Sequence, residues 1–248
     1  MNQEKCLPEL LNEGLQLWLK GEDQLGFKAP AGKLSSELKE RLIAAKSDLL
    51  SIMKPNRRYA PCSSGQHRFW FLEQLEGPNP VYTIFLTFRL DGAFNSDLLQ
   101  KSLNILSERH ASLRTTFEAI DGQPYQVIHD KMDIPIELGE LIGSDPDDPV
   151  FIEKHLRKRT RYIFDLQVGP LWKFHLLKLS PDQHVLMLLC HHIISDGVSS
   201  SIVLRELDTI YRALEENRSP ELKEVASYSD YVCLLSPIPN FLSANIVR

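Results

Sequence analysis

The feature that most constrains the fold is an uninterrupted apolar stretch at residues 185–190, which is followed directly by His191 and His192. It is far shorter than the roughly 20 residues that a helix needs to cross a bilayer. A short run that is apolar throughout is typical of a strand covered on both faces. The sequence therefore predicts a central strand over residues 184–190, followed by a turn and an amphipathic helix over residues 198–214.

Other segments after Pro61 alternate between strand-like and helical periodicity. Strands are predicted at 81–90, 115–120, 125–128 and 171–179. Helices are predicted at 95–109 and 150–161. An Asp-Gly pair at 121–122 predicts a hairpin between the second and third of these strands. This part of the chain is therefore predicted to be a mixed α/β lobe.

The first 54 residues have a different pattern. They predict a short helix at 8–14, a hairpin from strands at 15–20 and 25–29, and a helix that Ser35 or Ser36 caps and that runs to Met53. The alternating leucines of the first strand should pack against the apolar stripe of this second helix, and Trp18 is expected in the same core. Residues 54–55, Lys-Pro, should end the helix, and the basic residues that follow are interpreted as a linker.

Composition limits the possible functions. The chain has 248 residues and a net charge of −5 without a basic block, which argues against a general nucleic-acid binder. No segment is long and apolar enough for a membrane span, and the N-terminus does not resemble a signal peptide. The four cysteines are scattered and show no zinc-ligand spacing, so we expect reduced structural thiols, no metal site and a cytoplasmic protein.

The turn at residues 191–197, His-His-Ile-Ile-Ser-Asp-Gly, is the best candidate for chemistry. Histidine has an unperturbed pKa of roughly 6.5, so it can accept and return a proton near neutral pH. Asp196 is better placed to fix the loop, paired with an arginine, than to touch substrate. Gly197 permits a close turn into the next helix. From the residues alone, packing histidines or a metal site remain alternatives, although no third ligand is suggested by spacing.

This turn resembles the H-H-x-x-x-D-G signature of condensation domains and chloramphenicol acetyltransferase-like acyltransferases. Other segments of the chain resemble further condensation-domain motifs, and they follow one another in the order that these domains show. Residues 63–72 resemble S-x-A-Q-x-R-L-W-x-L, and residues 109–117 resemble R-H-E-x-L-R-T-x-F with Ala111 in place of Glu. Residues 164–171 also resemble this family. Residues 228–232 resemble the start of Y-x-D-Y-A-x-W but lack the tryptophan.

The resemblance implies a fold, a reaction and roles for residues. The fold is a chloramphenicol acetyltransferase-like α/β sandwich lobe, the half of a condensation domain that bears the histidines. The reaction joins an acceptor amine to a donor thioester, and carrier proteins hold both substrates on phosphopantetheine arms, with no cofactor bound directly. His192 would be catalytic, as a base or by orienting the amine. His191 would structure the loop, Asp196 would pair with Arg114, and Gly197 would leave room for the acceptor arm.

Residues 7–53 resemble the N-terminal β-hairpin docking domain of tubulysin-type synthetases, with the sequence L-W-L-K-G-E-D-Q-L-G-F-K-A-P-A-G at its centre. Such domains capture the C-terminal tail of an upstream subunit. A hairpin with an open edge can add a peptide as a further strand. Lys20, Lys28 and Lys33 are the candidates for pairing with acidic residues of the tail; a solvated charged face is the alternative.

These inferences predict an α+β protein with a docking domain at 1–54, a linker at 55–61, the N-terminal lobe of a condensation domain at 62–232 and an atypical tail at 233–248. The expected function is that of a truncated nonribosomal peptide synthetase subunit. A lone lobe is expected to be inactive without a second lobe. Two alternatives stay open: a docking module that carries an inactive lobe, and an acyltransferase that assembles its cleft from copies of itself.

Overall fold

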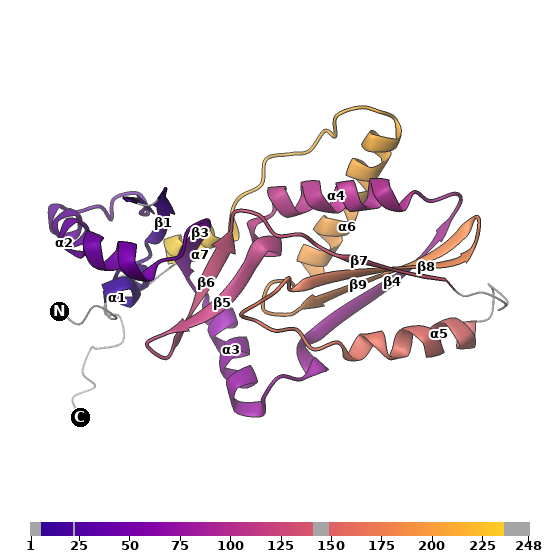
Figure 1. Ribbon diagram of the computed structural model, residues 1–248, viewed down its shortest axis with the longest axis horizontal. Coiled ribbons are helices and arrows are strands. Elements are labelled where there is room, and N and C mark those ends of the chain that lie inside the picture. Colours follow the sequence, from indigo (N-terminus) through magenta and orange to yellow (C-terminus); the bar gives the residue numbers. More distant parts are fainter. Residues whose placement is uncertain (1–5, 22, 141–148, 236–248) are drawn as a thin grey trace, which may run out of the picture. The chain divides into compact units, whose positions relative to one another are not determined.

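Strand β9 (Gln183–His191) lies inside a four-stranded sheet of order β4-β9-β8-β7 in the computed structural model (Figure 1). Its neighbours β4 (Thr83–Asp91) and β8 (Trp172–Ser180) both run antiparallel to it. The side chains of β9 from His184 onward are buried, so the prediction of a central strand is confirmed. Strand β7 (Ile136–Glu140), which pairs in parallel with β8, was not predicted.

The structure describes residues 6–21, 23–140 and 149–235. Its contacts divide the chain into two units, which are described separately. Unit 1 comprises Met1–His67, Thr116–Asp130 and Ala226–Arg248, and unit 2 comprises Arg68–Thr115 and Lys131–Val225.

Helices cover both faces of the four-stranded sheet of unit 2. Helices α4 (Ser96–Arg109) and α6 (Gly197–Glu215) lie side by side on one face, and α5 (Pro149–Arg157) lies on the other (Figure 1). The side chain of Asn95 caps α4 by accepting hydrogen bonds from the backbone N–H groups of Asp97 and Leu98. Short 3₁₀ turns occur at Pro80–Tyr82, Ala111–Arg114 and Arg159–Arg161. The unit is thus the α/β sandwich that the sequence predicts.

Unit 1 contains a five-stranded sheet of order β2-β1-β3-β6-β5. Helix α1 (Cys6–Asn12), strands β1 (Gln16–Lys20) and β2 (Gln24–Lys28), and helix α2 (Ser36–Ile52) form the predicted helix, hairpin and helix, and Ser35 is the cap of α2. Strands β5 (Thr115–Ile120) and β6 (Gln123–His129) form the predicted second hairpin.

The predicted linker is wrong in its local structure. Residues Arg57–Pro61 form strand β3, which pairs antiparallel with both β1 and β6. Tyr59 and Ala60 are fully buried, and the backbone groups of β3 bond to strands on both sides. Basic residues suggested a solvated connection, but their side chains are half-buried over the sheet while the backbone completes it.

Alternation of side chains divides the sheet of unit 1 into two faces. Leu15, Leu17 and Tyr59 point into the core formed with α1 and α2, together with the predicted stripe of α2. Trp18 points to the opposite face and is half-buried, so its predicted place in that core is wrong. It lies over Gly26, and the guanidinium carbon of Arg58 is 4.5 Å from its ring centroid.

Helix α7 (Tyr228–Leu235) packs against β3 within unit 1. Its Asp230 accepts hydrogen bonds from Gln16 of β1 and Lys28 of β2, both at 2.7 Å. Residues 233–235 of the predicted atypical tail are therefore helical, and the remainder of that tail lies outside the described residues. Helix α7 carries residues 228–232, which resemble a condensation-domain motif, and its Asp230 links this segment to both strands of the docking hairpin.

Candidate functional site

His192 lies at the start of the turn after β9, and its side chain is exposed. Its backbone N–H donates to the carbonyl of Tyr82 at 2.8 Å. One face of its imidazole stacks on Phe69 of helix α3 (Ser64–Glu76), with ring centroids 4.8 Å apart and planes 22° apart. Among the described residues, no side chain forms a hydrogen bond with its ring nitrogens.

His191, by contrast, is fully buried. Its Nδ1 accepts a hydrogen bond from the backbone N–H of Ile193 at 3.1 Å. Its Nε2 lies 3.4 Å from a carboxylate oxygen of Glu73, and the aromatic edges of Tyr82 and Phe164 surround the ring. These contacts fit the loop-structuring role that the sequence predicts for His191, which stays a prediction.

The turn ends where Asp196 caps helix α6. The carboxylate of Asp196 accepts hydrogen bonds from the backbone N–H and the hydroxyl of Ser199, both at 2.7 Å. These two hydrogen bonds lower the pKa of Asp196, because they stabilise its charged form. Asp196 therefore caps α6, and its role in fixing the loop stays a prediction.

The predicted ion pair between Asp196 and Arg114 is wrong. Within the described parts of unit 2 no such pair forms; the guanidinium of Arg114 instead donates to the backbone carbonyls of Ser107 and Glu108. A cap close in sequence satisfies Asp196 without a distant arginine. Gly197 does not have a left-handed backbone, and an added Cβ would meet nothing within 4 Å, so the turn itself does not require glycine. Room for an acceptor arm beside Gly197 remains a prediction.

The second candidate region is the docking hairpin. Strand β1 lies between β2 and β3, so the open edge of this hairpin belongs to β2. Beside β2 a cavity of about 440 Å³ is lined by Leu25 and Phe27 of the strand and by residues of α2. The α2 residues are Lys39, Leu42, Ile43 and Lys46. The groove is therefore apolar at its base, with two exposed lysines.

The three predicted docking lysines have different surroundings. Lys20 is exposed at the end of β1. Lys28 forms an ion pair with Asp230 at 2.7 Å. Lys33 is half-buried in the connection between β2 and α2 and has interactions of its own. None of the three lines the groove beside β2, so a role for them in docking stays a prediction.

Sequence reasoning missed Glu73, Phe69, Lys39 and Lys46. A carboxylate on a helix so rich in aromatic residues was a signal for Glu73, because buried charges need a partner. The two lysines are seven positions apart and flank the exposed Ile43, a spacing that places them on one helical face. Neither signal identifies what the side chains face across the fold.

Two family descriptions match the chain. "TubC N-terminal docking domain" matches residues 4–54, and "Condensation domain" matches residues 56–237. This chain belongs to the condensation-domain family. The match extends past residue 232, where the sequence analysis placed the end of the lobe.

Relatives of this condensation domain are much longer proteins. The dimodular nonribosomal peptide synthase of Bacillus subtilis is 36% identical over 216 residues, which is 84% of this chain and 9% of that protein. Tyrocidine synthase 3 of Brevibacillus parabrevis is 38% identical over 70% of this chain, which spans 3% of it. The chain therefore spans less than a tenth of these synthetases.

Solved structures support the same fold. The starter condensation domain of rhizomide synthetase RzmA aligns with a TM-score of 0.64 at 23% identity, over 70% of this chain and 42% of that one. The X-domain from teicoplanin biosynthesis aligns with a TM-score of 0.62 at 27% identity, over 74% and 38%. The expected chloramphenicol acetyltransferase-like fold is confirmed.

Two further observations concern metals and membranes. In residues 6–21, 23–140 and 149–235, no three His, Cys, Asp or Glu side chains are grouped so that they could hold a metal ion. Over the same residues, none of the helices has the length and apolar character of a membrane span.

Proposed function

We propose that this chain is the docking and condensation part of a nonribosomal peptide synthetase subunit. His192 would promote amide-bond formation between aminoacyl groups that carrier proteins hold as phosphopantetheine thioesters. The observation that carries the proposal is the exposed His192 at the end of a buried central strand, within the motif of the condensation-domain family. The relatives are synthetases, which supports the same substrate class.

The reaction that we propose forms one bond and breaks another. The acceptor amine attacks the donor carbonyl carbon, a C–N bond forms, the C–S bond breaks, and the amine proton is returned to the leaving thiolate. His192 fits two roles in this reaction. It accepts the proton as a general base, or it orients the amine and stabilises the tetrahedral intermediate. The exposure of His192 leads us to propose that the rest of a condensation domain covers it.

A substitution of His192 tests the proposal. In the intact subunit with loaded carrier proteins, we expect H192A to lower the rate of amide formation by at least about 100-fold. K101A, at an exposed position on α4, is the control and should keep the wild-type rate. A base would give a rate that falls as His192 is protonated, and a purely orienting residue would give a flatter pH profile. A wild-type rate in H192A would refute the proposal.

We further propose that β2 receives the C-terminal tail of an upstream subunit. An added strand would bond to the free backbone groups of β2, and its alternate side chains would enter the groove beside Leu25 and Phe27. The flanking Lys39 and Lys46 favour acidic residues in the tail. We also propose that Lys20, Lys28 and Lys33 contribute to this electrostatic attraction, as the sequence predicts.

Titration with synthetic tail peptides from the neighbouring synthetase subunits tests docking. Reversal of both groove charges, K39E with K46E, should weaken binding about 10-fold at low salt, and the difference should shrink as salt screens the charges. K101E is the matched control, because it reverses an exposed lysine on a helix of unit 2. Absence of binding by any of the tails, or equal loss in the control, would exclude this groove.

A further inference from the structure

Helix α3 contacts both histidines of the turn. Phe69 stacks on His192, and Glu73, one helical turn later, approaches His191. Glu73 is unusual for a carboxylate because its residue is only 8% exposed. Its other surroundings include a cavity of about 560 Å³, also lined by Trp70 and Asp165. A nearly buried charge beside the reactive turn calls for an explanation.

The hydrogen bonds of His191 define which nitrogen carries its proton. Nδ1 accepts from the N–H of Ile193, so Nδ1 has no proton and the neutral ring carries its proton on Nε2. Among the described residues, Nε2 is a buried nitrogen without a hydrogen-bond partner. The oxygen of Glu73 lies 3.4 Å from it but is not aligned for a hydrogen bond. A small movement of Glu73 would satisfy this buried donor.

The side chain of His191 also bridges the backbone on the two sides of His192. Its hydrogen bond reaches from the side chain of residue 191 to the amide of residue 193, across His192. Backbone bonds from His191 to Leu171 and from His192 to Tyr82 hold the same turn from outside. The direction in which His192 points therefore depends on the availability of Nδ1 as an acceptor.

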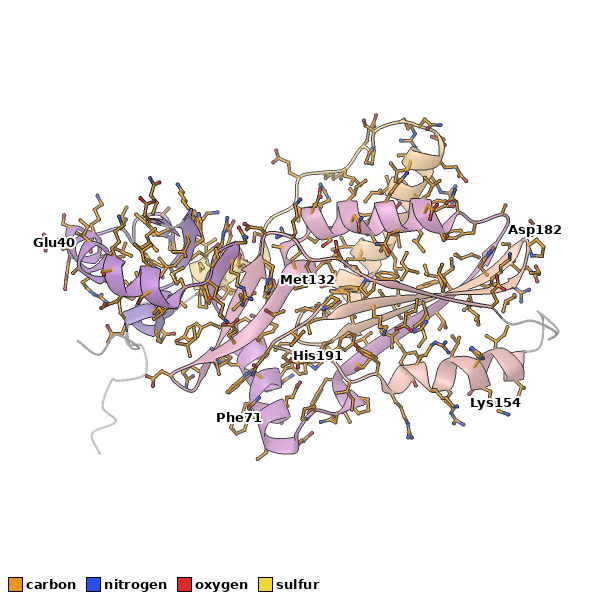
Figure 2. All side chains as sticks on the ribbon, viewed as in Figure 1. Glu40, Phe71, Met132, Lys154, Asp182 and His191 are labelled. Carbon is orange, nitrogen blue, oxygen red and sulfur yellow. The ribbon has the colours of Figure 1, made fainter. Side chains whose placement is uncertain are left out.

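We propose that Glu73 is a positioning residue of the condensation site. Its carboxylate holds His191, which is labelled in Figure 2, with the proton on Nε2; this keeps Nδ1 available to Ile193 and closes the turn that presents His192. This inference rests on the proposed role of His192, and it adds a residue from a different element of the fold. Helix α3 then orients both rings, one through Phe69 and one through Glu73.

The experiment is NMR spectroscopy of the ¹⁵N-labelled chain, with the imidazole nitrogens of His191 and the amide of Ile193 as readouts. E73Q keeps the size and an acceptor oxygen, whereas E73L keeps similar bulk without an acceptor. Wild type and E73Q should show the proton of His191 on Nε2. E73L should show a mixture of tautomers, with hydrogen exchange at the Ile193 amide at least about 10-fold faster. Q74L, an exposed neighbour on the same helix, is the control and should match wild type.

An unchanged tautomer and unchanged Ile193 exchange in E73L would overturn the proposal. If E73L does not fold, E73D replaces it: this variant withdraws the carboxylate by one methylene and should show the same two changes, and wild-type readouts would refute the proposal. In the intact subunit, E73L should slow amide formation and E73Q should restore it. The NMR readouts require no turnover, so a fully active H192A would refute the proposed function without altering the result for Glu73.

Discussion

Replacement of Gly26 by alanine tests how the docking hairpin is held together. Gly26 lies directly opposite Trp18 in the β1–β2 register. A Cβ at residue 26 would lie 2.4 Å from the indole Nε1 of Trp18, whereas ordinary contacts are 3.4–4 Å. The indole would have to move by about 1 Å to restore an ordinary contact. That movement would also disturb its contact with the guanidinium of Arg58.

The expected loss of stability in G26A follows from this clash. Overpacking of this kind costs about 1–3 kcal/mol of the free energy of unfolding. In a W18A background the clash is absent, and alanine should then stabilise the strand by about 0.5–1 kcal/mol because glycine loses more backbone entropy on folding. The two substitutions should therefore show a coupling energy of about 1.5–4 kcal/mol.

Urea unfolding of wild type, G26A, W18A and the double variant, followed by far-UV circular dichroism, measures this coupling. G197A serves as the control, because a Cβ there meets nothing within 4 Å. Additive effects, with a coupling below about 0.4 kcal/mol, would refute the reasoning that Trp18 packs on Gly26.

Two further predictions concern unit 2. D196A should cost about 1 kcal/mol of stability and D196N less, because asparagine keeps the oxygen that bonds to Ser199 and caps α6. Equal thermal unfolding of wild type, D196A and D196N would refute the cap. The pKa of His175 is lowered to about 4 by burial first, against the opposing effect of Glu137. Because His175 takes up its proton at a higher pH in the unfolded chain, the folded state should lose stability as the pH falls from 6.5 towards 4. Urea unfolding of H175Q should show a smaller loss over this pH range. An unchanged pH dependence in H175Q would contradict the assignment.

The sequence by itself determined the elements whose causes are local. The unbroken apolar run predicted β9, the pair Ser35 and Ser36 predicted where α2 begins, and the Asp-Gly pair predicted the β5–β6 hairpin. These predictions succeeded because periodicity, caps and turn residues act within a few positions. The ordered motifs likewise identified the family and the turn that carries His192.

Tertiary structure alone decided which distant groups meet. Strand β3 forms because β1 and β6 leave a place between them, although the basic residues of this segment suggested a linker. Trp18 faces Arg58 instead of the core, Asp196 bonds to Ser199 instead of Arg114, and Glu73 on helix α3 reaches His191 at the end of strand β9. Each of these outcomes depends on sheet order or on helix orientation, which no local pattern specifies. The sequence thus identified the turn that carries the family motif, and the fold decided what holds it in place.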